Sequence, residues 1–216
     1  MSRLVFFDLD GTISRRDTLV PYATSFLLRR RPWRAWRLLR LLPPTLAFAL
    51  GRGDRGVLKG ELIRAALGGA SRDTVAEWNR QFLPRLFARG LHPDALAAIA
   101  AHRRAGDHLV LMSASVDLYV PDIGRELGFD QTICSGVRWD GDRLDGRLAT
   151  ANRRDEEKAR CFRELAARHA GLPTEAYGNS FSDLPHMVLA SRAVMVNPGA
   201  ALQGECRKLG IETVRW

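Results

Sequence analysis

Residues 4–12 decide the fold of this chain, and they read Leu4-Val5-Phe6-Phe7-Asp8-Leu9-Asp10-Gly11-Thr12. The apolar run at 4–7 predicts a short, fully buried β-strand. Asp8 and Asp10 follow at i and i+2, so both side chains lie on one side of the strand end, and Gly11 permits a sharp turn. Two acids at the C-terminal end of a strand are typical of a cation or proton-transfer site in an open α/β sheet. A solvated Asp-Gly turn is the plainer interpretation of the same residues.

The remainder of the chain predicts an α/β core that is split by a helical insert directly after the first strand. Residues from about 17 to 91 have a helical pattern, with breaks at Pro43-Pro44, Gly51-Arg52-Gly53 and Gly68-Gly69 and with Ser71 or Asp73 as a helix cap. Strands and helices alternate from residue 92 onward, which favours βαβ units and a parallel sheet.

Specific elements are predicted in this second part. They are a helix at 95–104, a buried strand at 108–112 that ends in Ser113-Ala114-Ser115, a β-hairpin at 131–150 with Asp-Gly turns at 140–141 and 145–146, a helix at 155–169 and a strand at 193–196.

The composition is that of a soluble globular protein, with 46% hydrophobic and 26% charged residues among 216. The three cysteines lie far apart without CxxC spacing, so we expect neither a disulfide framework nor a zinc site. We therefore expect the protein in a reducing cytoplasm. Acidic residues from position 8 onward argue against a secretory signal. The sequence contains no window of 18 uninterrupted apolar residues, so we expect no simple transmembrane helix.

The positive charge is concentrated in one segment. The formal net charge is +9 and the sequence pI is about 10.4, nearly all from arginine, because lysine occurs only at 59, 158 and 208. Six arginines lie between Arg29 and Arg40, interleaved with Trp33 and Trp36. Such a segment suits an anionic membrane surface. A helical hairpin with solvated arginines, or attraction of an anionic soluble substrate, explains it as well.

Four segments contain the residues best suited to chemistry. They are Asp8-Leu9-Asp10-Gly11-Thr12, Met112-Ser113-Ala114-Ser115, Lys158 and Gly178-Asn179-Ser180-Phe181-Ser182-Asp183. Their order, spacing and content resemble the haloacid dehalogenase (HAD) superfamily of phosphohydrolases, specifically its phosphoserine-phosphatase-like subfamily IB. The resemblance implies a Rossmann-like parallel sheet flanked by helices, made by residues 1–14 and 92–216, with an all-helical cap domain at 15–91.

The resemblance further implies a Mg²⁺-dependent phosphomonoester hydrolase that acts through an aspartyl-phosphate. Asp8 would be the nucleophile, which divides a very slow displacement into two easier steps. Asp10 would protonate the leaving alkoxide and later activate water. Lys158 would neutralise charge shared by the nucleophile and the phosphoryl group, while Ser113 and the backbone N–H of Ala114 would bind phosphoryl oxygens.

The remaining implied site residues hold substrate or metal. Gly11, Thr12 and Asp17 would bind the substrate or its phosphate. The Mg²⁺ ligands would be Asp8, Asp10, Asn179 and Asp183. Asn179 departs from the family pattern, which usually has an aspartate there. An amide oxygen still ligates Mg²⁺ but removes one negative charge, so metal affinity should fall or Asp183 should contribute more.

Each of these residues also has a structural interpretation. Ser113 and Ser115 fit an ordinary helix cap, Lys158 fits an ion pair on a solvated helix face, and Asp183 fits an N-cap. The occurrence of all four segments in order favours the functional interpretation.

Substrate choice rests on the insert. Asp17 lies nine residues after Asp8, where phosphoserine phosphatases resemble one another in having an acid that meets the substrate's amine. This hints at phosphoserine or histidinol phosphate, although an N-cap explains Asp17 equally well. The segment Arg29–Arg40 instead suggests a phospholipid-head phosphatase of the phosphatidylglycerophosphate phosphatase type.

Three functions therefore stay open. The first is a cytoplasmic phosphatase of a small phosphorylated metabolite, and the second is a lipid-head phosphatase peripheral at the inner membrane face. The third is a non-catalytic lipid-surface or nucleic-acid-binding protein on a decayed phosphatase core. Nucleic acid ranks last because no aromatic stacking groove is evident. The sequence does not predict the oligomeric state.

Overall fold

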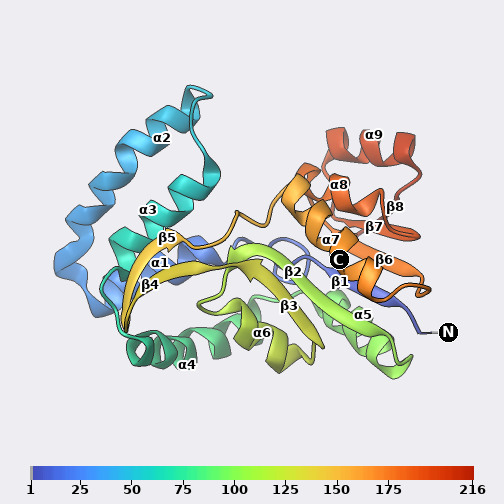
Figure 1. The fold of residues 1–216 in the computed structure, drawn as a ribbon, viewed down its shortest axis with the longest axis horizontal. Helices are drawn as coiled ribbons and strands as arrows, with labels where there is room; N and C mark the ends of the chain where they lie inside the picture. The colour runs from blue at the N-terminus through green and yellow to red at the C-terminus, as the bar shows by residue number, and fades with distance from the viewer. Residues whose placement is uncertain (1) are drawn as a thin grey trace.

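A six-stranded parallel β-sheet forms the centre of the molecule (Figure 1). The computed structural model describes residues 2–216, and the strand order is β3-β2-β1-β6-β7-β8. The strands are β1 (Leu4–Phe7), β2 (His108–Val116), β3 (Gln131–Ser135), β6 (Thr174–Gly178), β7 (Arg192–Val196) and β8 (Glu212–Val214). Every neighbouring pair is parallel, so the predicted α/β fold class is confirmed.

The sheet separates two hydrophobic clusters, because successive strand residues face opposite sides. In β1, Val5 and Phe7 belong to one cluster and Leu4 and Phe6 to the other, and all four are fully buried. Helices α5 (Pro93–Arg104) and α6 (Val120–Leu127) cover the first cluster. Helices α7 (Glu156–Arg168), α8 (Leu184–Met187) and α9 (Ala200–Leu209) cover the second. Burial on both faces explains why β1 is a continuous apolar run.

Strand β1 lies at the point where the strand order reverses. It pairs with β2 on one side and with β6 on the other, so that Phe7 lies opposite both Leu111 and Tyr177. The chain then leaves β1 through Asp8, whose backbone N–H donates to the carbonyl of Tyr177 at 3.0 Å. Ligands of open α/β sheets bind at such a switch point, outside the C-terminal ends of the strands.

The insert after β1 is helical, as predicted. Its elements are α1 (Leu19–Arg30), the 3₁₀ helix η1 (Pro32–Leu41), α2 (Leu42–Ala49), α3 (Arg55–Leu67) and α4 (Arg72–Arg89). Ser71 caps α4 by accepting the backbone N–H of Thr74. The predicted break at Pro43 and Pro44 corresponds to the boundary between η1 and α2, and both prolines lie in the first turn of α2, where proline is tolerated. Within residues 2–216, no helix combines the length and the apolar character needed to span a bilayer.

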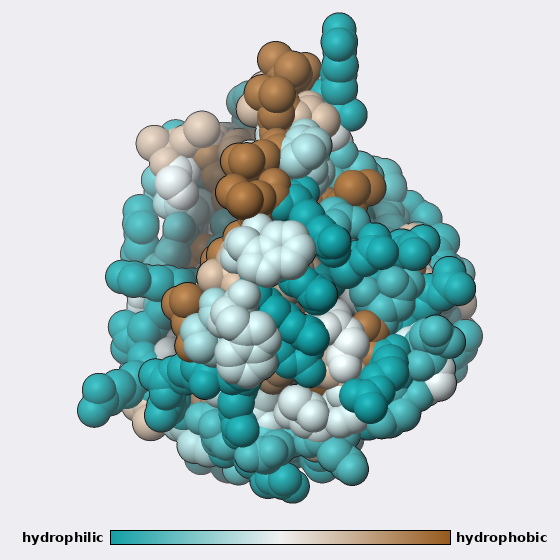
Figure 2. Space-filling model, turned by 90° about the vertical axis from the view of Figure 1, so that its left-hand side faces the viewer, coloured by the Kyte–Doolittle hydropathy of each residue, from teal (hydrophilic) through white to brown (hydrophobic). Residues whose placement is uncertain are grey.

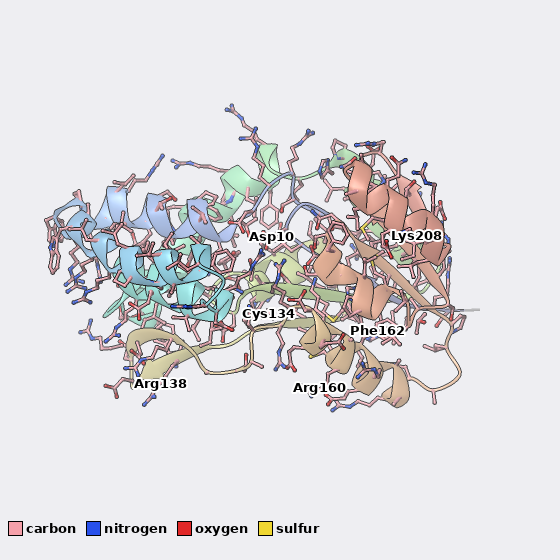
Figure 3. The ribbon with its side chains drawn as sticks, turned by 90° about the horizontal axis from the view of Figure 1, so that it is seen from above. Asp10, Cys134, Arg138, Arg160, Phe162 and Lys208 are labelled. Carbon is pink, nitrogen blue, oxygen red and sulfur yellow. The ribbon has the colours of Figure 1, made fainter. Side chains whose placement is uncertain are left out.

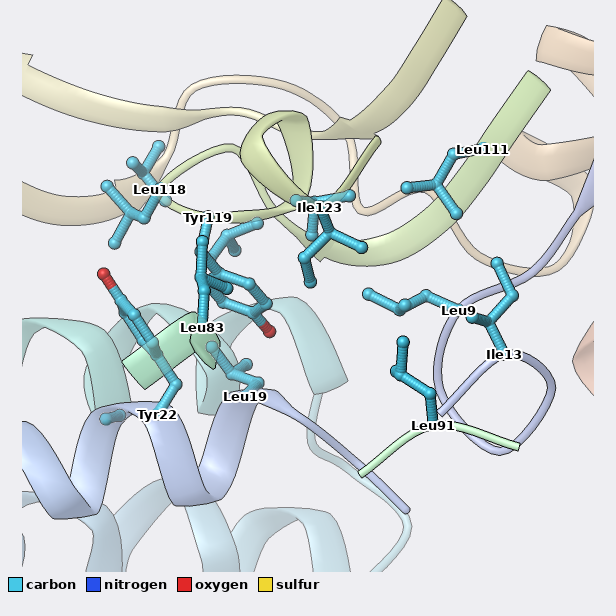
Figure 4. Packing of buried hydrophobic residues seen from close by; sticks show 14 of the residues in the cluster. Leu9, Ile13, Leu19, Tyr22, Leu83, Leu91, Leu111, Leu118, Tyr119 and Ile123 are labelled. Carbon is cyan, nitrogen blue, oxygen red and sulfur yellow. The ribbon is translucent and has the colours of Figure 1, made fainter. Parts of the chain in front are cut away.

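The helical insert packs directly on the core through one continuous hydrophobic cluster (Figure 4). Leu19 and Tyr22 of α1 meet Leu9 and Ile13, which follow β1, in this cluster. The rings of Tyr22 and Tyr119 have centroids 4.4 Å apart. This packing holds the insert over the C-terminal end of β1.

The predicted hairpin at 131–150 is shorter than expected. Its strands are β4 (Val137–Asp140) and β5 (Arg143–Leu148), while residues 131–135 form edge strand β3 of the main sheet. The turn at 140–141 is present, but the one predicted at 145–146 is wrong, because both residues lie within β5. Gly146 has φ +95°, and a Cβ there would lie 2.7 Å from the backbone N of Arg64 in α3. This glycine therefore permits close contact between the hairpin and the insert.

Other helix and strand boundaries differ from the predicted ones by a few residues. Strand β2 extends to Val116, four residues beyond the predicted end at Met112. The predicted helix at 155–169 is confirmed as α7. Helix α9 and strand β8, near the end of the chain, were not predicted.

Candidate active site

A pocket of about 430 Å³ lies where β1, β2 and β6 end beneath the helical insert. Figure 3 places Asp10 at the junction between the insert and the sheet. The core contributes Asp8, Asp10, Gly11, Ala114, Ser115, Lys158, Asn179 and Asp183, among others, and the insert contributes Asp17, Arg55 and Lys59. All four predicted segments therefore meet at one pocket.

Lys158 joins two buried carboxylates at the floor of this pocket. Its Nζ donates to Oδ1 of Asp8 and to Oδ1 of Asp183, at 2.6 Å in each case. The three residues are only 2%, 7% and 1% exposed, respectively, so Lys158 does not lie on a solvated helix face. Oδ2 of Asp183 accepts the hydroxyl of Ser180 at 2.7 Å and the backbone N–H groups of Asn179 and Ser180 at 3.2 and 3.0 Å. Asp183 thereby holds Lys158 against Asp8.

Burial and ion pairing compete in setting the pKa values of this group. Burial raises the pKa of Asp8 to about 7, with Lys158 opposing and the neighbouring Asp183 and Asp10 adding to the rise. Burial also acts to raise the pKa of Asp183, but Lys158 outweighs it and holds that pKa well below its usual range. Burial acts to lower the pKa of Lys158, but its two carboxylate partners raise it overall. Lys158 and Asp183 are therefore charged at neutral pH.

Hydroxyl groups hold Asp10 at the junction between insert and core. Its Oδ1 accepts the backbone N–H of Thr18 at 2.7 Å and the Thr18 hydroxyl at 2.6 Å, and its Oδ2 accepts the Ser115 hydroxyl at 2.5 Å. The Thr18 hydroxyl also lies 2.8 Å from that of Tyr119. Burial raises the pKa of Asp10, although the hydrogen bonds from Ser115 and Thr18 oppose the rise. A positioned carboxyl with a raised pKa is suited to proton transfer.

Lys59 reaches from α3 of the insert to the core. Its Nζ donates to the carbonyl of Ala114 and, at 2.6 Å, to Oδ1 of Asn152. Burial lowers the pKa of Lys59 to about 8, with Asp10 opposing. Neither Lys59 nor Asn152 was predicted as a site residue. The one available signal was that Lys59 is among only three lysines in an arginine-rich chain.

Ser113 and Ser115 both lie in β2, so they do not form a helix cap. Ser113 is fully buried, and its Oγ accepts the backbone N–H of Ser115 at 3.0 Å. Ala114 and Ser115 line the pocket. Of these two serines, it is Ser115 whose hydroxyl donates to Asp10, whereas the predicted phosphate-binding role had been given to Ser113.

Thr12 and Gly11 support the acids at the end of β1. Thr12 is fully buried, and its hydroxyl lies 3.4 Å from Oδ2 of Asp8. Gly11 has φ +85°, and a Cβ there would clash with the side chain of Asn179. This glycine is thus required both by the turn and by the close approach of Asn179.

Asp17 makes the contact expected of a helix cap, while its role toward a substrate amine stays a prediction. Its Oδ1 accepts the backbone N–H of Val20 at 2.9 Å in the first turn of α1, which is a capping contact. The residue also lines the pocket.

Protein donors engage the carboxylates of the predicted metal site to different extents. Both oxygens of Asp10 and both of Asp183 accept hydrogen bonds from protein groups. Across residues 2–216, no three or more His, Cys, Asp or Glu side chains are arranged as a metal site. Asp8 accepts from Lys158 at Oδ1, but the donor nearest to its Oδ2 is the Thr12 hydroxyl at 3.4 Å. The predicted set of four ligands stays a prediction, and Asp8 and Asn179 are the two of them that combine a place at the pocket with the loosest contacts to protein donors. Mg²⁺ commonly takes one or two protein oxygens together with water and substrate phosphate, so this donor pair fits it.

The fold, its switch-point acids and its helical cap define the class of the protein, which is a capped α/β phosphatase. A family model described as haloacid dehalogenase-like hydrolase matches residues 5–187. The chain belongs to this family, so the predicted resemblance to the haloacid dehalogenase superfamily is confirmed.

Among curated relatives, the chain is 34% identical over 189 residues to Protein CicA of Caulobacter vibrioides, covering 87% of this chain and 82% of that protein. It is 26% identical over 152 residues to a histidinol-phosphatase of Neisseria meningitidis, covering 68% of each. Among solved structures, a protein of unknown function from Bordetella pertussis superposes with a TM-score of 0.84 at 23% identity over 99% of both chains. A substrate-bound phosphoserine phosphatase superposes with a TM-score of 0.68 at 15% identity, over 95% of this chain and 90% of that one. At these identities the two structures show the fold alone.

Proposed function

We propose that this phosphatase hydrolyses a small phosphomonoester through an aspartyl-phosphate on Asp8. The observation that carries the proposal is the contact of Lys158 with both Asp8 and Asp183 at the pocket floor. A fixed ammonium beside the nucleophile stabilises the negative charge that gathers there in the transition state. Because Asp183 is itself held by Ser180, Lys158 needs little reorganisation when substrate binds.

In the first step, a carboxylate oxygen of Asp8 bonds to phosphorus and the bond from phosphorus to the leaving oxygen breaks. The proton of Asp10 passes to that oxygen, which departs as an alcohol. In the second step, Asp10 takes a proton from water as the water oxygen bonds to phosphorus, and the Asp8 carboxylate leaves. Ser115 and Thr18 orient Asp10 for both proton transfers.

Mg²⁺ is the proposed cofactor, with Asp8 and Asn179 as its side-chain ligands. When bound, it would neutralise charge on the phosphoryl oxygens. The amide of Asn179 contributes no charge, so we expect weaker Mg²⁺ binding than with an aspartate there. The Asn179→Asp variant should lower the Mg²⁺ concentration at half-maximal activity.

The rim of the pocket favours a substrate with a second anionic group. Apart from Asp8, Asp10, Lys158 and Asp183, the lining includes five basic side chains and a single acid, Asp17. The basic residues are Arg15, Arg16, Arg55, Lys59 and Arg154. Phosphoserine offers a carboxylate to these cations and an ammonium to Asp17, whereas histidinol phosphate offers only cationic partners. A phosphatidylglycerophosphate headgroup offers a second phosphate.

The test is phosphate release with Mg²⁺ from a panel of phosphoserine, histidinol phosphate, non-amino metabolites and micellar phosphatidylglycerophosphate. Wild type should turn over at least one anion-bearing member, and Asp8→Asn should abolish that turnover while leaving the thermal unfolding midpoint within a few degrees. No turnover of any member would overturn the proposal and favour the non-catalytic alternative. The soluble and lipid members separate the two substrate sources.

A further inference from the structure

The helical insert has an apolar row on its outer face that no part of residues 2–216 covers. Its members are Trp33, Trp36, Leu39, Leu42, Leu46 and Leu50, which are between 59% and 69% exposed. Elements η1 and α2 carry the row at the end of the insert farthest from the sheet (Figure 1). Figure 2, which faces this end, shows hydrophobic side chains as a stripe bordered by hydrophilic ones. Few monomeric proteins expose a continuous apolar row of this kind without a partner.

The sequence and the helix type together produce the row. Residues 33–41 read Trp-Arg-Ala, Trp-Arg-Leu, Leu-Arg-Leu, a pattern with a period of three. Because η1 is a 3₁₀ helix with three residues per turn, residues three apart lie above one another. Trp33, Trp36 and Leu39 therefore align, and in α2 the row continues at spacing four through Leu46. The row spans about 30 Å at the usual rise of the two helix types.

A second row in η1 is cationic. Arg34, Arg37 and Arg40 follow the apolar residues one position later, and the guanidinium groups of Arg37 and Arg40 each lie 5.9 Å from the ring centroid of Trp36. Residues 18–53 contain no acid. Their seven basic residues, which make up most of the net charge of +9, are Arg29, Arg30, Arg31, Arg34, Arg37, Arg40 and Arg52.

We infer that this face of η1 and α2, here called the interfacial row, docks on an anionic lipid bilayer. The indoles of Trp33 and Trp36 match the headgroup level, the leucines enter the acyl boundary, and the arginines meet lipid phosphates. A second copy of this chain fits less well, because a self-complementary contact would bring two acid-free arginine clusters together. The inference concerns binding and does not depend on the proposed reaction.

Docking would also bring the catalytic pocket close to the lipid surface. Arg55 begins α3, five positions after Leu50, the last residue of the interfacial row. Its guanidinium lies 5.3 Å from the ring centroid of Phe48 in α2, and it lines the pocket. An anionic headgroup at the bilayer surface would therefore meet the basic rim first.

The test is co-sedimentation of the full chain with vesicles of equal phosphatidylcholine and phosphatidylglycerol, compared with pure phosphatidylcholine, at about 50 and 500 mM salt. We expect strong binding only to the anionic vesicles at low salt. A charge variant, with Arg29→Gln, Arg40→Gln and Arg52→Gln, should weaken binding by about 100-fold, at roughly fivefold per arginine. Its matched control, with Arg104→Gln, Arg168→Gln and Arg207→Gln, removes three exposed arginines from the core and should lose less than about tenfold.

An apolar variant, with Trp33→Gln, Leu39→Gln and Leu46→Gln, should also lose binding, whereas Leu96→Gln, Val188→Gln and Leu209→Gln should not. The six residues that these two variants change are all exposed, so no buried side chain is touched and the thermal midpoint should stay unchanged. Equal losses in variants and controls, or no binding to anionic vesicles, would overturn the inference. So would a concentration-dependent dimer in sedimentation velocity that the apolar variant abolishes, if vesicle binding is absent.

Discussion

Lys158→Met tests whether the ion pairs at the pocket floor hold two buried carboxylates in place. Lys158 Nζ lies 2.6 Å from an oxygen of Asp8 and of Asp183. Removing one partner from a buried pair typically costs about 3–5 kcal/mol, because a charge is left without compensation. We expect a loss of that size in the free energy of unfolding at pH 8. The exposed Lys208→Met should change it by less than about 0.5 kcal/mol.

The pH dependence separates charge from packing. Without Lys158, the pKa values of both carboxyl groups in the folded variant should rise above those in the unfolded chain. Such groups add stability at low pH and lose it as pH rises through the folded pKa. The loss relative to wild type should therefore be clearly smaller at pH 5 than at pH 8.

Urea unfolding of both proteins at pH 5 and pH 8 measures this difference. An equal loss at the two pH values would show that the cost comes from packing of the lysine stem, and it would refute the electrostatic argument. A loss below about 1 kcal/mol at pH 8 would refute it as well.

Three further predictions concern the rim, the hairpin and the acid. Because the pKa of Lys59 is lowered to about 8, its positive charge is present below pH 8 and is lost above it. In wild type, KM for an anion-bearing substrate should therefore rise above pH 8. In Lys59→Met, KM should be higher than in wild type below pH 8 and should change less with pH. Gly146→Ala should destabilise by about 1–3 kcal/mol in urea unfolding, since its φ of +95° and the backbone of α3 both oppose a side chain, whereas Gly204→Ala in α9, which has open space, should be neutral or stabilising. Ser115→Ala should lower kcat by roughly tenfold with little change in KM, because the general acid loses a positioning hydrogen bond; an unchanged kcat would exclude this role.

Much of the candidate site was predictable because its chemistry is concentrated in short segments. Asp8 and Asp10 follow a strand that is apolar on both faces, which is typical of a strand in the interior of a parallel α/β sheet. Lys158 and Asp183 were found through the order of the segments. Their contact with each other was not predictable, since it depends on how α7 packs beside the end of β6.

The residues that were missed come from elements that meet only in three dimensions. Lys59 lies on a helix of the insert and Asn152 in a loop of the core, 93 positions apart, yet they are joined at 2.6 Å. The hydrogen bond of Ser115 to Asp10 spans 105 positions. Nothing in the local pattern of either segment specifies such a pairing.

By itself, the sequence determined the α/β class, the helical insert after the first strand and the acid pair at its end. These follow from local apolar periodicity and from the geometry of a strand end, which act over a few residues. Only the tertiary structure decided that the carboxylate oxygens of Asp10 and Asp183 accept hydrogen bonds from protein donors. It also decided that Lys59 of the insert bonds to the core at the pocket, and that apolar residues of η1 are exposed. Each of these depends on which groups from distant segments are brought within hydrogen-bonding or packing distance, and that is settled by burial of the common core.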